Sequence, residues 1–169
     1  MVKYSRIDLT ENILDKVANL YKIVWDSADP LINERLLKHA NYDGFKGIVI
    51  LSDEEEAIGF SYGYTSLPGQ FYHEKLAKEF SSEEYNKWLK DCFEFVELAV
   101  HPDYRQQGFG RILVNELLQD IKNKTVILTT QVNNRPARSL YESLNWICLK
   151  DQFFPSVKDN PYIIMGKKL

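Results

Sequence analysis

The sequence predicts an α/β (α+β) fold in which a mixed central sheet of six to seven strands has helices on both faces. Short stretches rich in branched and aromatic residues, which strands prefer, alternate with longer stretches whose apolar residues recur every three to four positions, as in helices. In addition, the stretch from Phe93 to Val100 is largely apolar on both of its alternating sides. Such a stretch is expected at the centre of a sheet that is covered on both faces.

The N-terminal part of the chain is predicted to hold a strand, two helices and a hairpin. The expected ranges are 3–8 for the strand, 13–26 and 30–42 for the helices, and 47–51 and 57–65 for the hairpin strands. Asp29 and Pro30 begin the second helix, because proline is favoured in a first turn. Two aromatic residues near these helices, Trp25 and Tyr42, either face a substrate or pack in the core.

The rest of the chain is predicted to add a helical connection and a second group of strands. Residues 70–91 are expected to be helical, and we expect their aromatic side chains to influence which acceptor is used. Further strands are expected at 125–132, 146–149 and 162–165, and a loop over 151–161 separates the last two. A helix after Pro136 has apolar residues at helical spacing and ends at Asn145.

The loop between the central strand and its helix has the features of a diphosphate site. Gly108 and Gly110 lack a Cβ, so main chain and ligand can approach closely there. An apolar helical pattern follows from Phe109 to Ile121, and a helix N-terminus offers unpaired N–H groups to an anion. Arg105 and Arg111 add positive charge. On these residues alone, an ordinary strand-to-helix turn with glycines for packing is the alternative.

Two blocks of the sequence resemble the signature of the GCN5-related N-acetyltransferases (GNAT). In the first block, Arg105, Gly108 and Gly110 occupy the defined positions of the family pattern (Gln or Arg)-x-x-Gly-x-(Gly or Ala). The second block reads Asn134-x-x-Ala137-x-x-Leu140-Tyr141-x-x-Leu144-Asn145-Trp146, where the family usually ends in Gly-Phe. Asparagine is the next-best residue for a left-handed helix end, so this departure is mild. The order of the predicted elements fits the family over nearly all of the chain.

The resemblance implies a GNAT fold whose central parallel strands splay apart, with acetyl-CoA as the co-substrate. The main chain of Leu98, Ala99 and Val100 would then pair with the pantetheine arm. Asn134 would contact the arm or the adenylate side, and Ala137 would leave room for it. The residues expected to hold the diphosphate are Arg105, Gln106, Gln107, Gly108, Phe109, Gly110 and Arg111.

Two residues are predicted to move protons. Tyr141 matches the tyrosine of the second family block and is the predicted general acid for the departing thiolate; a packed aromatic ring is the alternative. Glu97 lies mid-strand on an otherwise apolar face, where loss of water would raise its pKa, and is the predicted base; a structural salt bridge is the alternative. No cysteine lies next to a plausible base, and the resemblance implies direct transfer in a ternary complex.

Length and composition favour one N-acetyltransferase domain over residues 1–169. The net charge of −3 argues against nucleic acid as a partner, and no apolar run approaches the length of about 18 residues that a membrane span needs. No signal peptide is visible, and Cys92 and Cys148 are expected to be buried thiols in a reducing cytoplasm. No metal site is predicted, because His39, His73 and His101 lack partners at ligand spacing.

The predicted function is therefore acetyl transfer from acetyl-CoA to a primary amine of a small molecule. The acidic balance favours a cationic acceptor such as a polyamine or an aminoglycoside. A protein N-terminal or lysine acetyltransferase and a non-catalytic acyl-CoA-binding or regulatory module are the alternatives. A dinucleotide-binding domain fits poorly, because its glycine fingerprint should follow an early strand. A homodimer would be common for this kind of protein.

Overall fold

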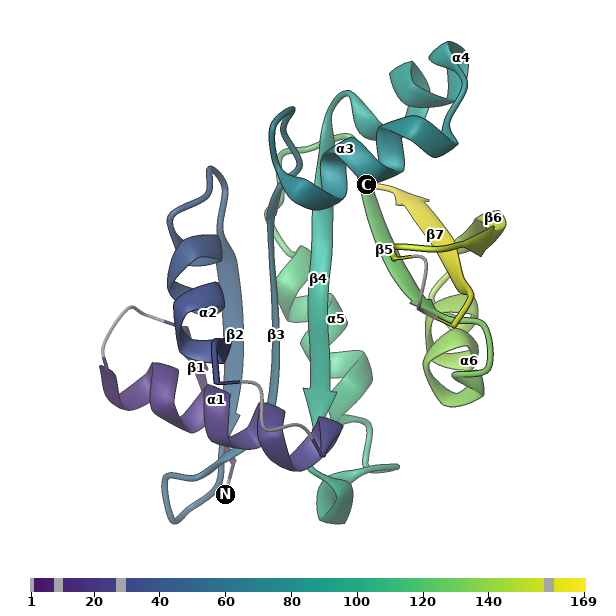
Figure 1. Cartoon of the computed structure of the whole chain (residues 1–169). Coiled ribbons are helices and arrows are strands. Elements are labelled where there is room, and N and C mark those ends of the chain that lie inside the picture. The colour runs from purple at the N-terminus through teal and green to yellow at the C-terminus, as the bar shows by residue number, and fades with distance from the viewer. Residues whose placement is uncertain (1, 8–10, 27–29, 157–159) are drawn as a thin grey trace. The chain divides into compact units, whose positions relative to one another are not determined.

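The computed structural model describes residues 2–7, 11–26, 30–156 and 160–169. The strands are β1 (Lys3–Arg6), β2 (Lys46–Leu51), β3 (Ala57–Thr65), β4 (Cys92–Val100), β5 (Thr125–Gln131), β6 (Ile147–Phe153) and β7 (Tyr162–Lys168). The α-helices are α1 (Glu11–Trp25), α2 (Ile32–Ala40), α3 (Phe71–Glu79), α4 (Ser82–Glu84), α5 (Phe109–Leu118) and α6 (Arg135–Ser143) (Figure 1). A π-helical turn, η1 (Tyr85–Leu89), continues α4, and a 3-10 turn, η2 (Pro102–Tyr104), follows β4.

The strands form a seven-stranded mixed sheet in the order β1-β2-β3-β4-β5-β7-β6, which confirms the predicted fold class. Strands β4 and β5 are parallel, whereas the β1–β2, β2–β3, β5–β7 and β6–β7 pairs are antiparallel. The parallel register joins Cys92 with Thr125, Phe93 with Val126 and Glu94 with Ile127. Pairing of the two parallel strands ends after Glu94, as expected for central strands that splay.

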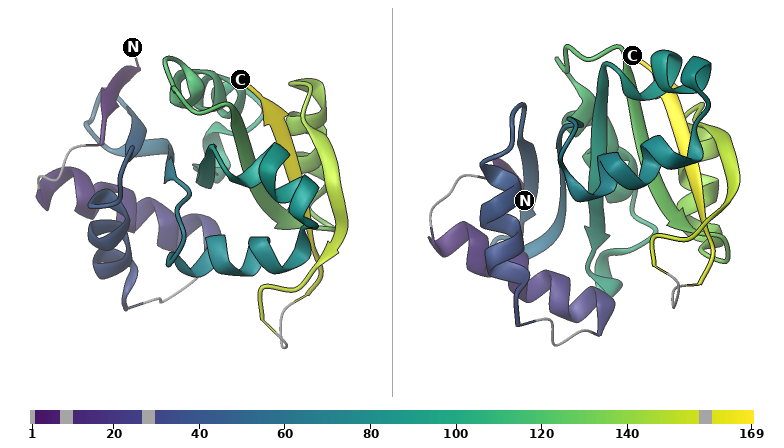
Figure 2. Two further views of the ribbon diagram at one scale, coloured as in Figure 1. Left: turned by 90° about the horizontal axis from the view of Figure 1, so that it is seen from above. Right: turned by 45° about the horizontal axis from the view of Figure 1, so that its top comes forward.

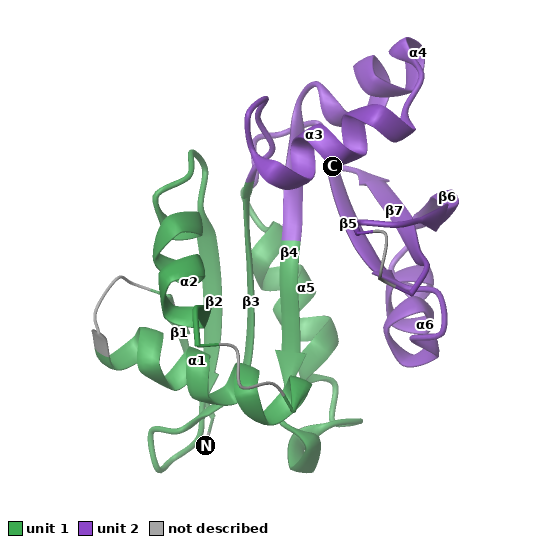
Figure 3. Ribbon diagram, in the orientation of Figure 1, with its two compact units in different colours: residues 1–64, 96–120 green, residues 65–95, 121–169 purple. Residues whose placement is uncertain are grey.

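The chain divides into two compact units (Figure 3). Unit 1 comprises residues 1–64 and 96–120, and unit 2 comprises residues 65–95 and 121–169. Strand β4 contributes to both units, since the division falls between Phe95 and Val96. Each unit has its own apolar core. That residues 1–169 form a single domain stays a prediction.

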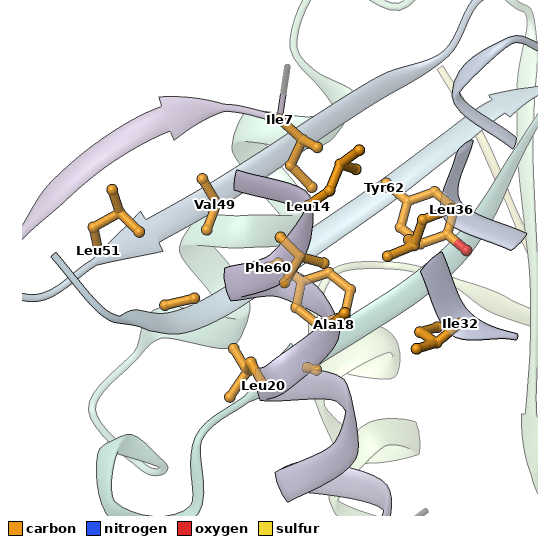
Figure 4. Close-up of a cluster of buried hydrophobic side chains, with 13 residues drawn as sticks. Ile7, Leu14, Ala18, Leu20, Ile32, Leu36, Val49, Leu51, Phe60 and Tyr62 are labelled. Atoms are coloured by element: carbon orange, nitrogen blue, oxygen red, sulfur yellow. The ribbon is translucent and has the colours of Figure 1, made fainter. Parts of the chain in front are cut away.

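In unit 1, helices cover both faces of the strands. Phe60 and Tyr62 of β3 are buried among apolar side chains of α1 and α2, including Leu20 and Leu36 (Figure 4). Gly59 and Ser61 alternate with them and so face the opposite side of the strand. There the Ser61 hydroxyl donates to the Leu113 carbonyl oxygen of α5 at 3.1 Å, and an added Cβ at Gly59 would lie 3.1 Å from the Leu113 side chain. Gly59 thus marks a close approach between β3 and α5.

In unit 2, strands β5, β7 and β6 lie side by side in that order (Figure 2). A second buried cluster joins the helical connection to them through Leu76, Trp88, Leu89 and Ile164. The prediction that residues 70–91 are helical is confirmed by α3, α4 and η1. The side chain of Ser81 caps α4, and Glu84 completes the capping box.

Several local expectations turn out differently. The last two strands reach Phe153 and Lys168, beyond their predicted ends. The edge strand β6 was predicted too short because it is mostly exposed and lacks an apolar pattern. For the same reason Cys148 is exposed, so its prediction as a buried thiol is wrong, whereas Cys92 is buried as predicted. The predicted end of the first strand at Asp8 and the predicted start of the second helix at Asp29 lie outside the described residues. Asn145 has φ of 64°, which confirms the left-handed helix end.

The helices and the metal-ligating side chains of the described residues bear on a membrane and a metal as partners. None of the helices in the described part of the chain is both long and apolar enough to pass through a bilayer. Within those same residues, no three or more His, Cys, Asp or Glu side chains gather in a way that would hold a metal ion. Buried His73 instead lies between Ser66 and Tyr85, with its Nδ1 2.9 Å from the Ser66 hydroxyl and its Nε2 3.1 Å from the Tyr85 hydroxyl.

Candidate active site

The end of β4 is fixed to its neighbour before the chain turns into the loop. The N–H of His101 donates to the Ile58 carbonyl oxygen at 2.8 Å, and the His101 Nδ1 accepts from the Asp103 N–H at 3.2 Å. Pro102 then opens the 3-10 turn η2, where a missing N–H is tolerated. These contacts hold the start of the loop at a defined place beside the strand.

The loop turns into α5 through two residues with left-handed backbones. Gln106 has φ of 61°, and Gly108, the N-cap residue, has φ of 86°. Gly108 is exposed, and no side chain makes a capping hydrogen bond to the helix. The first hydrogen bond of α5 runs from the Ile112 N–H to the Gly108 carbonyl oxygen at 3.2 Å. The first-turn amides at Phe109 and Gly110 therefore precede the helix's own hydrogen bonding. An exposed, uncapped helix N-terminus suits a diphosphate.

Side chains of the loop brace its shape. The Arg105 Nε donates to the Val100 carbonyl oxygen at 3.2 Å, and the Gln107 side-chain amide donates to the Asp103 carbonyl oxygen at 3.3 Å. Arg105, Gln107 and Arg111 are all exposed, so the loop and the first turn of α5 carry two solvent-accessible arginines. The sequence-predicted loop residues are thus brought together, and their contact with a diphosphate stays a prediction.

The three β4 residues predicted to pair with pantetheine lie just before this loop. Ala99 is buried in the apolar core of unit 1, whereas Leu98 and Val100 are half-buried. Their main chain belongs to a central strand, so any pairing with a ligand would extend a sheet ladder. This role also stays a prediction.

Asn134, Ala137 and Tyr141 lie together at and within α6. The Asn134 Oδ1 accepts from the Ala137 N–H at 3.3 Å, so Asn134 is the helix N-cap. Tyr141 is buried, with its ring 6.1 Å from Phe95 and 5.5 Å from Trp146, measured between centroids. Tyr141 is thus a packed aromatic ring, as its alternative role requires. The role of Tyr141 as general acid stays a prediction.

Glu97 occupies a half-buried position on the part of β4 that belongs to unit 1. Burial raises the pKa of its carboxyl to about 7, although the positive charge of Arg35 and a hydrogen bond from the Trp25 side chain both act to lower it. A carboxyl with a pKa near 7 is well matched to proton transfer at neutral pH. The rise that the sequence predicted for Glu97 is therefore present.

Arg35 is a neighbour of Glu97 that the sequence interpretation missed. Burial acts to lower its pKa, but a hydrogen bond with Tyr21 and the electrostatic effects of Tyr62, Tyr21 and Glu97 outweigh burial and raise it. The guanidinium carbon lies 5.0 Å from the Tyr21 ring centroid. Its Nε and Nη2 are buried and have no hydrogen-bond partner among the residues that the structure describes.

A signal for Arg35 was present in the helical pattern. Ile32, Arg35, Leu36 and His39 follow the i, i+3, i+4, i+7 spacing of one helix face, and Ile32 and Leu36 are core residues. A cation at this spacing is unusual, because charged side chains are rarely placed on a buried stripe unless they are paired. Its partner was not predictable, since Glu97 is on a distant strand.

The aromatic residues nearby have different environments. Trp25 is 45% exposed, so of its two alternatives the core position is wrong and the substrate-facing one stays a prediction. Tyr42 is half-buried and packs edge-on against Tyr64 at 4.8 Å between ring centroids. Burial and the charges of Arg35 and Lys38 lower the pKa of His39 to about 4, and its Nδ1 lies 3.0 Å from the Tyr62 hydroxyl. His39 is therefore neutral at physiological pH.

Curated proteins with similar sequences are found by comparison with this chain. The [Ribosomal protein bS18]-alanine N-acetyltransferase of Escherichia coli strain K12 is 34% identical over 64 residues, which are 35% of this chain and 43% of that protein. The uncharacterized protein ML0378 of Mycobacterium leprae is 31% identical over 74 residues, which are 43% of this chain and 21% of that protein. The chain thus spans less than half the length of these curated relatives.

Solved structures share the fold over nearly the whole chain. The ribosomal-protein-S18-alanine N-acetyltransferase of Escherichia coli superposes with a TM-score of 0.70 at 18% identity, covering 99% of this chain and 94% of that chain. Arabidopsis thaliana NAA60 in complex with acetyl-CoA gives 0.71 at 15% identity, covering 100% and 99%. An aminoglycoside 6'-N-acetyltransferase complexed with coenzyme A gives 0.67 at 16% identity, covering 98% and 96%.

The model of one family matches most of the chain. It is the Acetyltransferase (GNAT) family model, and the match extends over residues 14–146. Those residues contain the β4–α5 loop, Glu97 and Tyr141. The chain belongs to the acetyltransferase (GNAT) family.

Proposed function

We propose that this protein transfers the acetyl group of acetyl-CoA to a primary amine. The observation that carries the proposal is the exposed, uncapped N-terminus of α5 behind the left-handed Gly108, in a chain of the GNAT family. The main-chain amides there would hold the diphosphate, and the main chain of Leu98 to Val100 would align the pantetheine arm. Holding both substrates in one geometry supplies much of the rate of such a transfer.

In the proposed reaction, the neutral amine attacks the thioester carbonyl carbon, so that a C–N bond forms and the C–S bond breaks. Glu97, directly or through a water molecule, takes the proton that the amine loses. Tyr141 gives a proton to the departing thiolate. Each step moves one proton between groups that can accept or release it, and no covalent acyl-enzyme is needed.

The acceptor that the site supports best is the α-amino group of a peptide or protein. The proposed reaction begins with a neutral amine, and at pH 7 a much larger fraction of an α-amine is neutral, with an ammonium pKa of about 8, than of a lysine side chain, with an ammonium pKa of about 10.4. The positive charge of Arg35 beside Glu97 also disfavours acceptors that carry several positive charges. The partial similarity to an enzyme named for acetylating the alanine of a ribosomal protein points the same way.

A small-molecule amine is the second candidate acceptor. The net charge of −3 would favour a cationic compound such as a polyamine or an aminoglycoside over an acidic one. This long-range effect is weaker than the local charge of Arg35, because salt screens exposed charges beyond about 10 Å.

A turnover assay with a panel of acceptors tests both the reaction and the choice of acceptor. Thiol release from acetyl-CoA is followed with short peptides bearing free N-termini, the same peptides with blocked N-termini and one free lysine, spermidine and an aminoglycoside. We expect release with the free N-termini only. Release with spermidine or the aminoglycoside alone would favour the second candidate, and acetyl-CoA binding by calorimetry without release on any amine would indicate a non-catalytic module.

A further inference from the structure

His73 is a buried imidazole with a hydroxyl group beside each of its two nitrogen atoms. Its Nδ1 lies 2.9 Å from the Ser66 Oγ, and its Nε2 lies 3.1 Å from the Tyr85 hydroxyl oxygen. His73 is only 2% exposed, and the Tyr85 ring stands edge-on to it at 5.8 Å between centroids. Ser66 directly follows β3, whereas His73 belongs to α3 and Tyr85 begins η1, all within unit 2 (Figure 3). These contacts therefore tie two parts of the helical connection to the end of β3.

The turn between β3 and α3 holds Ser66 in a fixed place. The Ser66 N–H donates to the Cys92 carbonyl oxygen of β4 at 2.8 Å, and Ser66 is itself buried. Gln70 is the N-cap residue of α3. Its side-chain amide accepts from the Leu67 N–H at 2.9 Å and donates to the Thr65 carbonyl oxygen at 3.1 Å. The Ser66 hydroxyl is thus a rigid anchor for the imidazole ring.

The segment η1 is fixed at its far end by contacts that do not involve the imidazole. It is a π-helical turn, in which the Lys90 N–H donates to the Tyr85 carbonyl oxygen at 3.0 Å, and such turns are rare and often functional. At its far end the Thr125 hydroxyl donates to the Trp88 carbonyl oxygen at 2.7 Å, and Trp88 is buried. At its near end Tyr85 is half-buried and bonds to His73 through its hydroxyl. The start of η1 therefore depends on His73 more than its end does.

A neutral imidazole suits this site, and a protonated one does not. A neutral ring has one donor and one acceptor nitrogen, so one of the two neighbouring hydroxyl groups donates to it. A protonated ring donates from both nitrogen atoms, so that hydroxyl must turn its own proton away. Within the described part of the chain His73 forms no ion pair, so its charge would be buried and uncompensated. Burial accordingly lowers the pKa of His73, although the charge of Glu74 acts to raise it.

We propose that the hydrogen bonds from Ser66 to His73 and from His73 to Tyr85 form an acid-sensitive latch. At neutral pH the latch holds α3 and the start of η1 against the end of β3, and uptake of a proton from solvent by His73 releases them. Leu76 and Phe80 keep the connection attached to the apolar core of unit 2, so release is a local opening and not unfolding of the protein. The latch acts on the fold of the connection and does not depend on which reaction the protein catalyses.

The groups that face His73 come from three elements besides its own position. On α3, Glu74 supplies a charge that acts on His73, and its carboxylate accepts a main-chain N–H of the preceding turn at 2.8 Å. From the end of β3 and from η1, the ring faces the hydroxyl groups of Ser66 and Tyr85. Strand β4 reaches this place through the Cys92 carbonyl oxygen that is bound to Ser66. Glu74→Gln removes the charge and keeps an acceptor, so it separates the effect of Glu74 from that of His73.

Hydrogen exchange of the full chain at pH 7.5 and pH 5, followed by mass spectrometry, tests the latch. The rates are corrected for the intrinsic effect of pH on exchange. A lowered pKa in the folded state stabilises the closed form above a pH of about 6.5, and this effect is lost as pH falls. Peptides over residues 71–86 should therefore lose up to about 30-fold of their protection at pH 5, since an opened imidazole with an ordinary pKa of about 6.5 is favoured by that factor. Protection of β5 and β7 should change far less.

His73→Gln is the central variant, because glutamine offers donors and an acceptor but takes up no proton in this range. Its protection over residues 71–86 should be nearly the same at both pH values. Tyr85→Phe should already lose about 2- to 10-fold of that protection at pH 7.5, since it removes one hydrogen bond. Glu74→Gln and His39→Gln are the matched controls and should keep the acid response of the wild type, the latter because His39 belongs to unit 1. An acid response of wild-type size in His73→Gln, or none in the wild type, would overturn the latch.

A second measurement does not require His73→Gln to fold. Nitrogen-15 NMR of the three histidine rings in the wild type follows the protonation of His73, whose signals are assigned by elimination with His39→Gln and His101→Gln. We expect the His73 ring of the folded protein to titrate below its ordinary value of about 6.5. A ring that titrates at or above that value would show that protonation of His73 costs the closed form nothing, and the latch would be refuted.

Discussion

Replacing Glu97 with glutamine should change how the stability of the protein depends on pH. Burial raises the pKa of Glu97 from an ordinary 4.5 to about 7 in the folded chain. Between these values the folded protein keeps a proton that the unfolded chain releases, so the free energy of unfolding falls as pH rises. Glutamine has the shape of the protonated carboxyl and cannot ionise, so the variant escapes this loss.

The size of the effect follows from the pKa values. Each pKa unit corresponds to about 1.36 kcal/mol, so the wild type should lose about 2 to 3 kcal/mol of stability between pH 5 and pH 8 through Glu97. Unfolding in urea, with the wild type and Glu97→Gln measured at both pH values, gives this quantity as a difference of differences. The stability of Glu97→Gln relative to the wild type should increase by that amount at the higher pH.

The comparison between the two proteins is necessary because His39 acts in the opposite direction. Its pKa is lowered to about 4, so its contribution to stability is complete above about 6.5 and is lost as pH falls toward 4. That contribution is the same in both proteins and cancels in the difference. If Glu97→Gln and the wild type differ by the same free energy at pH 5 and pH 8, the carboxyl is not held in the environment described here.

Three further predictions use the same logic of matched comparison. His39→Gln should gain about 2 to 3 kcal/mol relative to the wild type between pH 7.5 and pH 4.5 in the same urea assay, and a constant difference would contradict the burial of its ring. Gly108→Ala and its control Gly69→Ala should each lower the free energy of unfolding by about 1 to 2 kcal/mol, because both glycines have a positive φ in open space. Calorimetry should find that acetyl-CoA binds about tenfold more weakly to Gly108→Ala but not to Gly69→Ala. Equal affinities would remove the α5 N-terminus from the site. Tyr141→Phe should lower kcat by about 10²-fold or more in the turnover assay. Calorimetry should find acetyl-CoA binding unchanged, since the ring still packs on Phe95 and Trp146. Undiminished turnover would exclude the acid role.

The sequence by itself determined the features that depend on short stretches of chain. Asn145 takes up the left-handed backbone that its place at a helix end predicted. The apolar spacing predicted most helices and strands, because side-chain periodicity reflects local geometry. The two motif blocks were sufficient to indicate the family, since they combine residue type with spacing. The edge strand β6 was predicted too short, because an exposed edge has no buried face to impose a pattern.

Only the tertiary structure decided the electrostatic environment of the candidate base. Glu97 was recognisable as a charged residue on an apolar strand, but its neighbours Trp25 and Arg35 lie more than 60 positions earlier in the chain. A pKa depends on which charges, dipoles and apolar groups surround the carboxyl in space, and packing of α1 and α2 on the strands sets those distances. The same packing left Trp25 exposed and placed the Arg35 charge on a buried stripe, neither of which residue spacing alone can specify.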